Sequence, residues 1–200
     1  ALTVSEPLTP ENCSVQGAPT WSPDSSKLAV SLLERRTVKG PRRIMSAHYR
    51  AEGLGFTDDL IQRIAVVDRS VGFERYITTA ANGLCLQPEW SPCGRRLLFQ
   101  STDNAVPISS YSPRLMTVGI DDGRVNALLD EHWFVAAARW LPCGERVAVC
   151  AVRDSTLTVP NTSLWVVDLH GNLDLRTPDI TAKIGGMLHH DMPAWDLTRG

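Results

Sequence analysis

Four tryptophans recur in the same local context, and this repeat is the feature that most constrains the fold of the chain. Trp21, Trp90 and Trp140 are each followed by a proline, a polar turn and an apolar stretch, and a shortened copy of the pattern ends at Trp195. Successive tryptophans are separated by about 50 to 70 residues, a spacing close to that of known repeat architectures. The sequence therefore predicts a fold built from repeated units.

Each repeat predicts about four short antiparallel strands. One strand ends at the tryptophan, and a second leaves the turn that follows, as in a hairpin. A third apolar strand is then expected at 64–68, 115–118 and 164–168. Glycine turns at Gly72, Gly123 and Gly171 precede the fourth strands, which are expected at 75–78, 124–128 and 173–176. Units of this kind are typical of propeller blades.

The predicted fold is all-β: a partial β-propeller with three four-stranded antiparallel blades and the start of a fourth. Residues 1–200 are expected to be part of one propeller, with blades at about 18–86, 87–136 and 137–190 and a fourth beginning at about 191. The alternative is an all-β sandwich with coincidental tryptophans. That alternative does not explain why tryptophan, proline, turn and apolar strand recur in one order.

The equivalent positions of Trp21, Trp90, Trp140 and Trp195 predict a core role between blades. Burial of each indole would contribute about 2 to 3 kcal/mol.

The turns that follow these tryptophans do not keep an Asp-Gly pair. The first has Asp24 followed by Ser25 in place of glycine, whereas the others have cysteine before Gly94 and Gly144. Because a thiol is a weak acceptor, we expect these two turns to depend mainly on glycine.

Charge and composition exclude several classes of function. The 20 Lys and Arg residues and 22 Asp and Glu residues give a net charge of −2, so no binding to nucleic acid or to an anionic membrane is expected. No apolar run approaches the length of a membrane span, about 20 residues. Five scattered cysteines without a C-x-x-C pair favour free thiols in a reducing compartment, although disulfides stay open. We therefore expect a cytoplasmic protein.

The first repeat has an insertion at about 34–59 that the other repeats lack. Loops inserted on one face of a propeller often carry function, although a solvated basic loop is the simpler alternative. The candidate contact residues lie in its second half: Tyr49, Arg50, Glu52, Gly53, Gly55 and Phe56.

The run Tyr49-Arg-Ala-Glu-Gly-Leu-Gly-Phe56, followed by an Ile-Ala-Val-Val-Asp strand and a Gln-Pro-Glu-Trp-Ser-Pro repeat, resembles the propeller of prolyl-oligopeptidase-family (S9) serine peptidases. It is most similar to their acylaminoacyl-peptidase and dipeptidyl-aminopeptidase-like branch, which typically has aspartate where this chain has Glu52. The resemblance extends from about residue 18 to 195. The tryptophan repeat alone is also shared with TolB-like propellers.

This resemblance implies a non-catalytic propeller that gates the access of short peptides to an α/β-hydrolase domain. The expected partners are that catalytic domain and the remaining blades, in the same or a companion chain. The insertion would face the substrate or the catalytic domain: Arg50 could hold a peptide carboxylate with two hydrogen bonds, and Glu52 could pair with a free amino terminus. A ring cut into segments also exposes blade faces, so a homo-oligomer is a further alternative.

No catalytic residue is predicted within the chain itself. The sequence has no G-x-S-x-G nucleophile motif, so whether this chain is itself an enzyme stays open. The longer protein that would contain it is expected to be the serine peptidase. The dense cluster His189-His190-Asp191 is interpreted as an inter-blade loop, and no metal or cofactor is expected. The alternative function is a TolB-like or WD40-like interaction scaffold without enzymatic activity.

Overall fold

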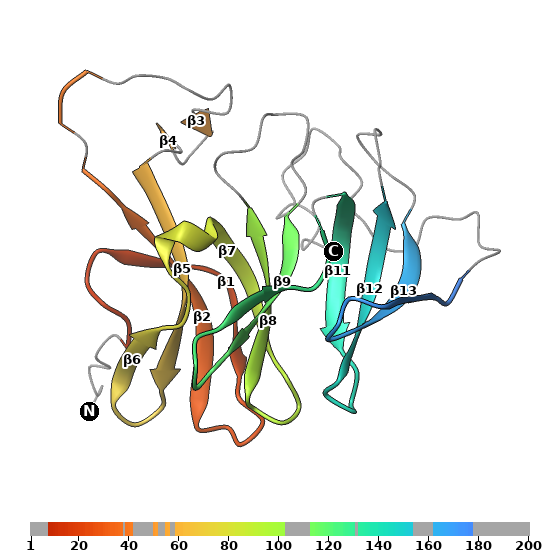
Figure 1. Ribbon diagram of the computed structural model, residues 1–200. Helices are drawn as coiled ribbons and strands as arrows, with labels where there is room; N and C mark the ends of the chain where they lie inside the picture. Colours follow the sequence, from red (N-terminus) through yellow and green to blue (C-terminus); the bar gives the residue numbers. More distant parts are fainter. Residues whose placement is uncertain are drawn as a thin grey trace, which may run out of the picture.

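The computed structural model describes residues 8–37, 39–41, 50–51, 55–56, 59–102, 113–130, 132–153 and 162–177. These residues form three four-stranded antiparallel sheets, in each of which the strands follow their order in the chain (Figure 1). The first sheet contains β1 (Cys13–Trp21), β2 (Lys27–Arg35), β5 (Leu60–Asp68) and β6 (Gly72–Tyr76). The second contains β7 (Leu84–Trp90), β8 (Arg96–Thr102), β9 (Arg114–Gly119) and β10 (Val125–Ala127). The third contains β11 (Trp133–Trp140), β12 (Arg146–Arg153), β13 (Ser163–Asp168) and β14 (Leu173–Leu175).

Two smaller elements complete the described structure. The strands β3 (Arg50–Ala51) and β4 (Gly55–Phe56) form a separate two-stranded sheet, and a 3₁₀ helix covers Ala80–Asn82. The prediction of an all-β fold with three four-stranded blades is therefore confirmed, whereas Trp195 and the start of a fourth blade lie outside the described residues.

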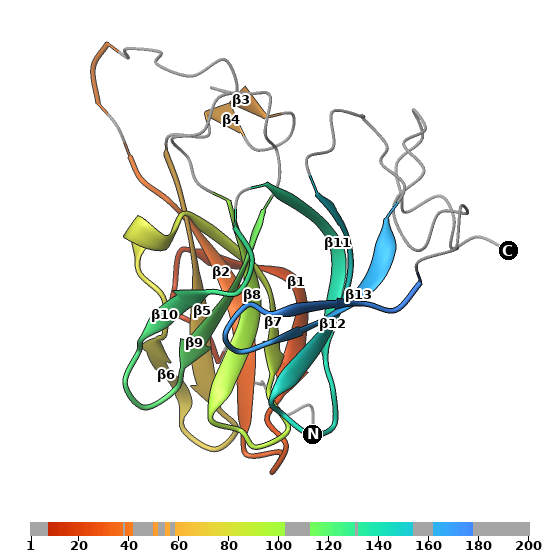
Figure 2. The ribbon, with the colours of Figure 1, turned by 45° about the vertical axis from the view of Figure 1, so that its right-hand side comes forward.

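The three sheets stand side by side, and the first strand of each later sheet contacts the sheet before it (Figures 1 and 2). Strand β7 contacts β1, β2 and β5, and β11 contacts β7 and β9. The hairpin turns that follow the tryptophans lie together at the lower end of Figure 1. This arrangement is that of neighbouring blades in a propeller, in which sheets are set around a common axis.

Trp21, Trp90 and Trp140 each belong to a row of apolar residues that crosses all four strands of a sheet, which we call the tryptophan rung. The register pairs the tryptophan with the residue seven positions later, then with a residue of the third strand and one of the fourth. The rungs are Trp21, Leu28, Val67 and Phe73; Trp90, Leu97, Val118 and Val125; and Trp140, Val147, Val167 and Leu173. Directly paired residues share one face of a sheet, so each rung presents one apolar face.

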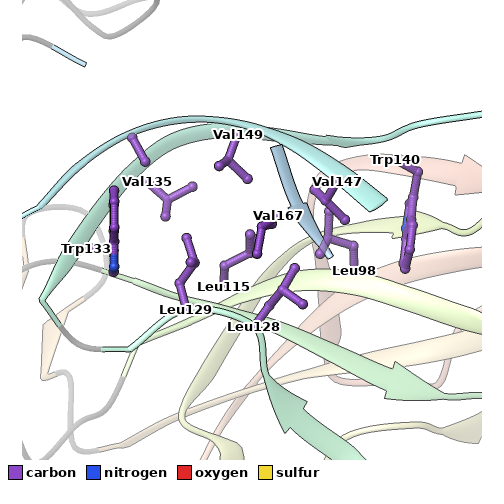
Figure 3. Packing of buried hydrophobic residues seen from close by; sticks show 11 residues of the cluster. Leu98, Leu115, Leu128, Leu129, Trp133, Val135, Trp140, Val147, Val149 and Val167 are labelled. Atoms are coloured by element: carbon purple, nitrogen blue, oxygen red, sulfur yellow. The ribbon is translucent and has the colours of Figure 1, made fainter. Parts of the chain in front are cut away.

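The rungs of the second and third sheets pack against the preceding sheet. Val147, Val149 and Val167 of the third sheet lie in one cluster with Leu98 and Leu115 of the second (Figure 3). The rung of the second sheet lies in a separate cluster with residues of the first, chiefly Ala29, Ile64 and Val66. The core is therefore divided into layers between sheets, and each layer depends on both of its neighbours.

Two indole hydrogen bonds link neighbouring sheets. Trp90 Nε1 donates to the carbonyl of Thr20 at 3.1 Å, and Trp140 Nε1 donates to the carbonyl of Glu89 at 3.3 Å. In both cases the acceptor is the residue just before the tryptophan of the preceding sheet. Trp90 and Trp140 are buried, with 7% and 8% of their surface exposed. A buried indole N–H needs such a partner, since leaving it unpaired costs about 1 to 3 kcal/mol.

Trp21 does not occupy the expected core position. It is 51% exposed, because no described sheet covers the face of the first sheet on which it lies. The role predicted from the repeat therefore applies to Trp90 and Trp140 within the described residues.

Backbone irregularities that the sequence pattern did not predict occur in the first strand of each sheet. Pairing shifts between Gln16 and Thr20, between Leu86 and Glu89, and between Val135 and Ala137. Such bulges bend a strand and turn its carbonyl groups away from the ladder. In β7 the freed Pro88 carbonyl accepts a hydrogen bond from the Thr20 hydroxyl at 2.9 Å, which adds a polar contact between the first and second sheets.

The turns after the tryptophans share one backbone conformation. Gly94 and Gly144 have φ of 70°, and Ser25, at the same place in the first turn, has φ of 58°. In that first turn, the Ser22 hydroxyl donates to Asp24 Oδ1 at 2.6 Å. In the second, Ser91 Oγ lies 3.4 Å from Cys93 Sγ, so the thiol takes the place of the carboxylate. We expected the cysteine turns to depend mainly on glycine, because a thiol is a weak acceptor. The second turn nevertheless has a side-chain contact, between Ser91 and Cys93.

The environments of the cysteines differ, although all five are free thiols. The Ser91 hydroxyl and the Arg95 backbone N–H lower the pKa of the exposed Cys93 thiol to about 7. The backbone N–H of Glu145 likewise lowers the pKa of exposed Cys143. Burial instead raises the pKa of Cys85 to about 11.

We predict that exchanging the residues of these turns changes stability in opposite directions. Gly94→Ser should cost about 1 kcal/mol, because a side chain disfavours this left-handed conformation. A Cβ at Gly94 would lie 3.7 Å from Pro23 Cδ, an ordinary contact, so the cost would arise in the backbone. Ser25→Gly should stabilise the protein by less, because glycine also gains entropy when unfolded. Thermal unfolding followed by circular dichroism tests both, and equal destabilisation by both substitutions would contradict the expectation.

Alkylation by iodoacetamide should follow the thiol environments. At pH 7 we expect Cys93 to react readily and its rate to level off above its pKa of about 7, while Cys85 stays protected in the folded protein. Mass spectrometry of the peptides gives the rate at each site. A rate for Cys93 that is still rising steeply above pH 8, as for an unperturbed thiol, would show that the turn does not stabilise the thiolate.

Candidate functional site

The insertion leaves the first sheet at the end opposite the tryptophan turns (Figure 1). Its foot is formed by β2 and β5, which pair as far as Arg35 and Leu60. Beyond this pair, the Arg36 backbone N–H donates to the Asp59 carbonyl at 2.7 Å, and Asp59 is buried. The insertion therefore starts from two hydrogen-bonded neighbouring strands rather than from a loose connection.

A short hairpin within the insertion brings three of the candidate residues together. Arg50 of β3 pairs with Phe56 of β4, and Ala51 pairs with Gly55. Phe56 is half-buried. Tyr49, Glu52 and Gly53 lie outside the described residues.

A polar cluster that the sequence analysis did not single out lies at the foot of the insertion. The Glu34 carboxylate accepts hydrogen bonds from the Arg63 guanidinium and the Tyr76 hydroxyl. Arg63 Cζ lies 3.5 Å from the centre of the Tyr76 ring, and Cys13 Sγ lies 3.6 Å from the Tyr76 hydroxyl oxygen. These residues come from β1, β2, β5 and β6, so the cluster joins all four strands of the first sheet.

The electrostatics of this cluster favour a fixed ion pair. Burial acts to raise the pKa of Glu34, but the hydrogen bonds from Tyr76 and Arg63 outweigh it, and the pKa is lowered. Burial and the neighbouring Glu34 raise the pKa of Tyr76, so its hydroxyl stays protonated and donates. Arg63 Nε is buried without a hydrogen-bond partner in the described part of the chain. The sequence feature that could have revealed this cluster is Arg63, a charged residue within the largely apolar strand of residues 60–68.

This arrangement of charged and aromatic side chains can position the insertion. Within the described ranges, no group of three or more histidine, cysteine, aspartate or glutamate residues is placed to hold a metal ion. His189-His190-Asp191 lies outside those ranges. None of the helical segments described is long and apolar enough to cross a membrane.

Comparisons with known proteins identify the fold. No protein-family model matches the sequence, and no curated protein matches it either. The acylaminoacyl peptidase of Pyrococcus horikoshii is 14% identical, with a TM-score of 0.59 over 86% of this chain and 26% of that chain. A TolB-type protein of Agrobacterium tumefaciens is 19% identical, with a TM-score of 0.53 over 84% of this chain and 50% of that chain. The oligogalacturonate lyase of Vibrio parahaemolyticus is 16% identical, with a TM-score of 0.57 over 84% and 42%.

These likenesses have two consequences. At identities this low, they establish the fold of the chain and not its activity. The chain spans about a quarter to a half of the length of these three structures. The structural neighbours of the chain are thus propellers of S9 peptidases, TolB-like propellers and a lyase of similar fold, each matched over only part of its length.

We predict that Glu34→Gln destabilises the protein at pH 7 by about 1 to 3 kcal/mol, because Arg63 loses its charged partner. The ordinary pKa of this carboxyl is 4.5, and its folded-state pKa is lower. The stabilisation is therefore fully present above pH 4.5 and is lost as the pH falls through the folded-state pKa. The difference between variant and wild type should accordingly shrink between pH 5 and pH 3.

Urea unfolding at these pH values measures the difference. The control is Glu74→Gln, which removes a more superficial ion pair with Lys27 at 2.7 Å and should cost about 1 kcal/mol or less. A cost of Glu34→Gln that is the same at pH 3 and pH 7 would contradict an ionised, hydrogen-bonded Glu34.

Proposed function

We propose that the chain is the non-catalytic propeller portion of a serine peptidase that resembles acylaminoacyl and dipeptidyl aminopeptidases. It would gate the access of short peptides to an α/β-hydrolase domain outside this sequence, in the same or a companion chain. Under this proposal, residues 1–200 are part of one propeller, with blades at about 18–86, 87–136 and 137–190. Acyl transfer would be carried out by the hydrolase domain.

The single observation that carries this proposal is the inserted hairpin on the first blade. A blade needs only a short connection between its second and third strands, yet here a hairpin of β3 and β4 stands on a foot closed by the Arg36–Asp59 backbone bond. Its residues are also those that resemble the peptidase propellers. A loop inserted at one end of a propeller is suited to contact a neighbouring domain or its substrate.

The roles proposed for the hairpin follow from chemistry. The Arg50 guanidinium could hold the carboxylate of a short peptide with two parallel hydrogen bonds. Glu52 could pair with a free amino terminus. Gly53 and Gly55 would let the backbone approach the partner closely, and Tyr49 and Phe56 would supply apolar contact.

A TolB-like interaction scaffold without enzymatic activity is the second candidate. The match to the TolB-type protein of Agrobacterium tumefaciens supports it, because that structure shares the fold and is not named as a peptidase. A fluorophosphonate probe that labels active serine hydrolases separates the two candidates. The peptidase proposal predicts labelling of the full-length protein at a serine outside residues 1–200. Absence of labelling under conditions that label a known serine peptidase would favour the scaffold.

Arg50→Ala in the full-length protein should lower kcat/KM for short peptides by about tenfold, the equivalent of about 1.4 kcal/mol of lost transition-state binding. Arg50→Lys should restore only part of it, because an ammonium group does not form the same pair of bonds. The control is Arg95→Ala, which removes an exposed arginine in a turn at the opposite end of the sheets. If Arg50→Ala stayed within twofold of wild type, the role of Arg50 would be withdrawn.

A further inference from the structure

The first part of the insertion is strongly basic. Residues 35–50 contain six lysine and arginine residues and no aspartate or glutamate, which leaves 14 basic and 22 acidic residues in the rest of the chain. Positive charge is therefore concentrated in one segment of a protein whose net charge is −2. Next to the foot of the insertion, the described residues that carry this charge are Arg35, Arg36 and Lys39, which we call the basic limb.

The basic limb starts from a fixed point of the first sheet. Arg35 pairs with Leu60, and the Arg36 backbone N–H donates to the Asp59 carbonyl at 2.7 Å. From there the described residues of 36–41 extend beyond the end of the sheet, at the end of the molecule that also carries β3 and β4 (Figures 1 and 2). The side chains of the basic limb are exposed. Its charge therefore lies at the same end as the inserted hairpin.

Two cations of the basic limb lack the carboxylate partners that other cations of the chain have. Within the described ranges, no hydrogen bond or ion pair involves the side chain of Arg36 or Lys39. Elsewhere such pairs occur, for example between Lys27 and Glu74 at 2.7 Å. Because residues 35–50 contain no acidic residue, a carboxylate that neutralises the basic limb has to come from outside this segment.

We propose that the basic limb binds the acidic side chains of short peptides and thereby selects acidic peptides as substrates. A guanidinium group holds a carboxylate with two parallel hydrogen bonds, and an ammonium group adds a further charge-assisted bond. The concentration of positive charge also attracts an anionic peptide before contact is made. Peptide binding by the basic limb stands on its own, whereas the statement about substrates rests on the proposed peptidase function.

A short peptide suits this charge distribution better than a nucleic acid does. Outside residues 35–50, the 22 acidic residues outnumber the 14 basic ones, so a long polyanion would be repelled once it extended past the insertion. A peptide with only a few carboxylates can contact the basic limb alone. Binding of nucleic acid is therefore the competing outcome that the experiment has to exclude.

Equilibrium binding to the full-length protein tests the proposal. The probe is an Ala-Glu-Ala-Glu-Ala peptide with an uncharged fluorescent dye, the control peptide has glutamine in place of glutamate, and fluorescence anisotropy measures the affinity. We expect the acidic peptide to bind at least about tenfold more tightly in about 20 mM salt, and this preference to shrink in about 300 mM salt, because screening weakens the attraction. Mass spectrometry checks that both peptides stay intact during the measurement.

Substitutions locate the binding on the basic limb. Arg36→Gln combined with Lys39→Gln should weaken binding of the acidic peptide by about three- to tenfold, as expected for the loss of two exposed ion pairs, and should leave the glutamine peptide unaffected. The matched control is Arg69→Gln combined with Arg124→Gln. It removes two exposed arginines from turns at the opposite end of the sheets and should leave both affinities unchanged.

Equal affinity for the two peptides, or equal losses in the two double variants, would overturn the proposal. Tighter binding of a single-stranded oligonucleotide of the same charge would overturn it in favour of a nucleic-acid site. Labelling by the fluorophosphonate probe, measured on the same preparation, separates this proposal from the proposed function. Selective binding of the acidic peptide without labelling would support the binding surface and refute only its peptidase role. Labelling without any acidic preference would refute the binding surface and leave the peptidase function standing.

Discussion

The structure depends on one contact that is repeated at each junction between sheets: an indole N–H that donates to a backbone carbonyl of the preceding sheet. Trp90 and Trp140 make this contact at 3.1 and 3.3 Å. Apolar packing alone does not select one relative position of two sheets. The hydrogen bond does, because its acceptor is one particular carbonyl at the end of the first strand of the neighbouring sheet. Apolar packing brings two sheets together, and the indole determines how far one lies along the other.

The tryptophan rung explains why the sheets are interdependent. A four-stranded sheet with two apolar faces cannot bury both by itself, so each sheet relies on a neighbour on either side. The first sheet partly compensates on its uncovered face. There the half-buried Leu28, Phe73 and Tyr76 pack against Val30, Leu32, Ala65 and Val67, which are buried. Tyr76 also donates to Glu34 in the polar cluster at the foot of the insertion, so one residue belongs both to this apolar layer and to the cluster beside the candidate site.

The repeat allowed most of the fold to be predicted from the sequence. The third strands expected at 64–68, 115–118 and 164–168 lie within β5, β9 and β13, because an apolar run bounded by a turn leaves few alternatives. The bulge in β7 was not predictable in this way, since Gln87 adopts φ of 51° without any local glycine signal, whereas the bulge in β1 contains Gly17 with φ of 71°. Nor was the exposure of Trp21, which depends on a neighbour and not on the residue itself. In the site, the insertion was predicted but the pairing of Arg50 with Phe56 was not, and the Glu34–Arg63–Tyr76 cluster arises from strands far apart in the sequence.

We propose that these sheets are an arc of a larger ring whose inserted hairpin faces a catalytic domain. A structure of the full-length protein determined at side-chain resolution by electron cryomicroscopy would test this proposal most directly. We expect that structure to contain further blades of the ring and an α/β-hydrolase domain at the end that carries β3 and β4. A ring with no hydrolase domain, or with that domain at the end of the tryptophan turns, would contradict it.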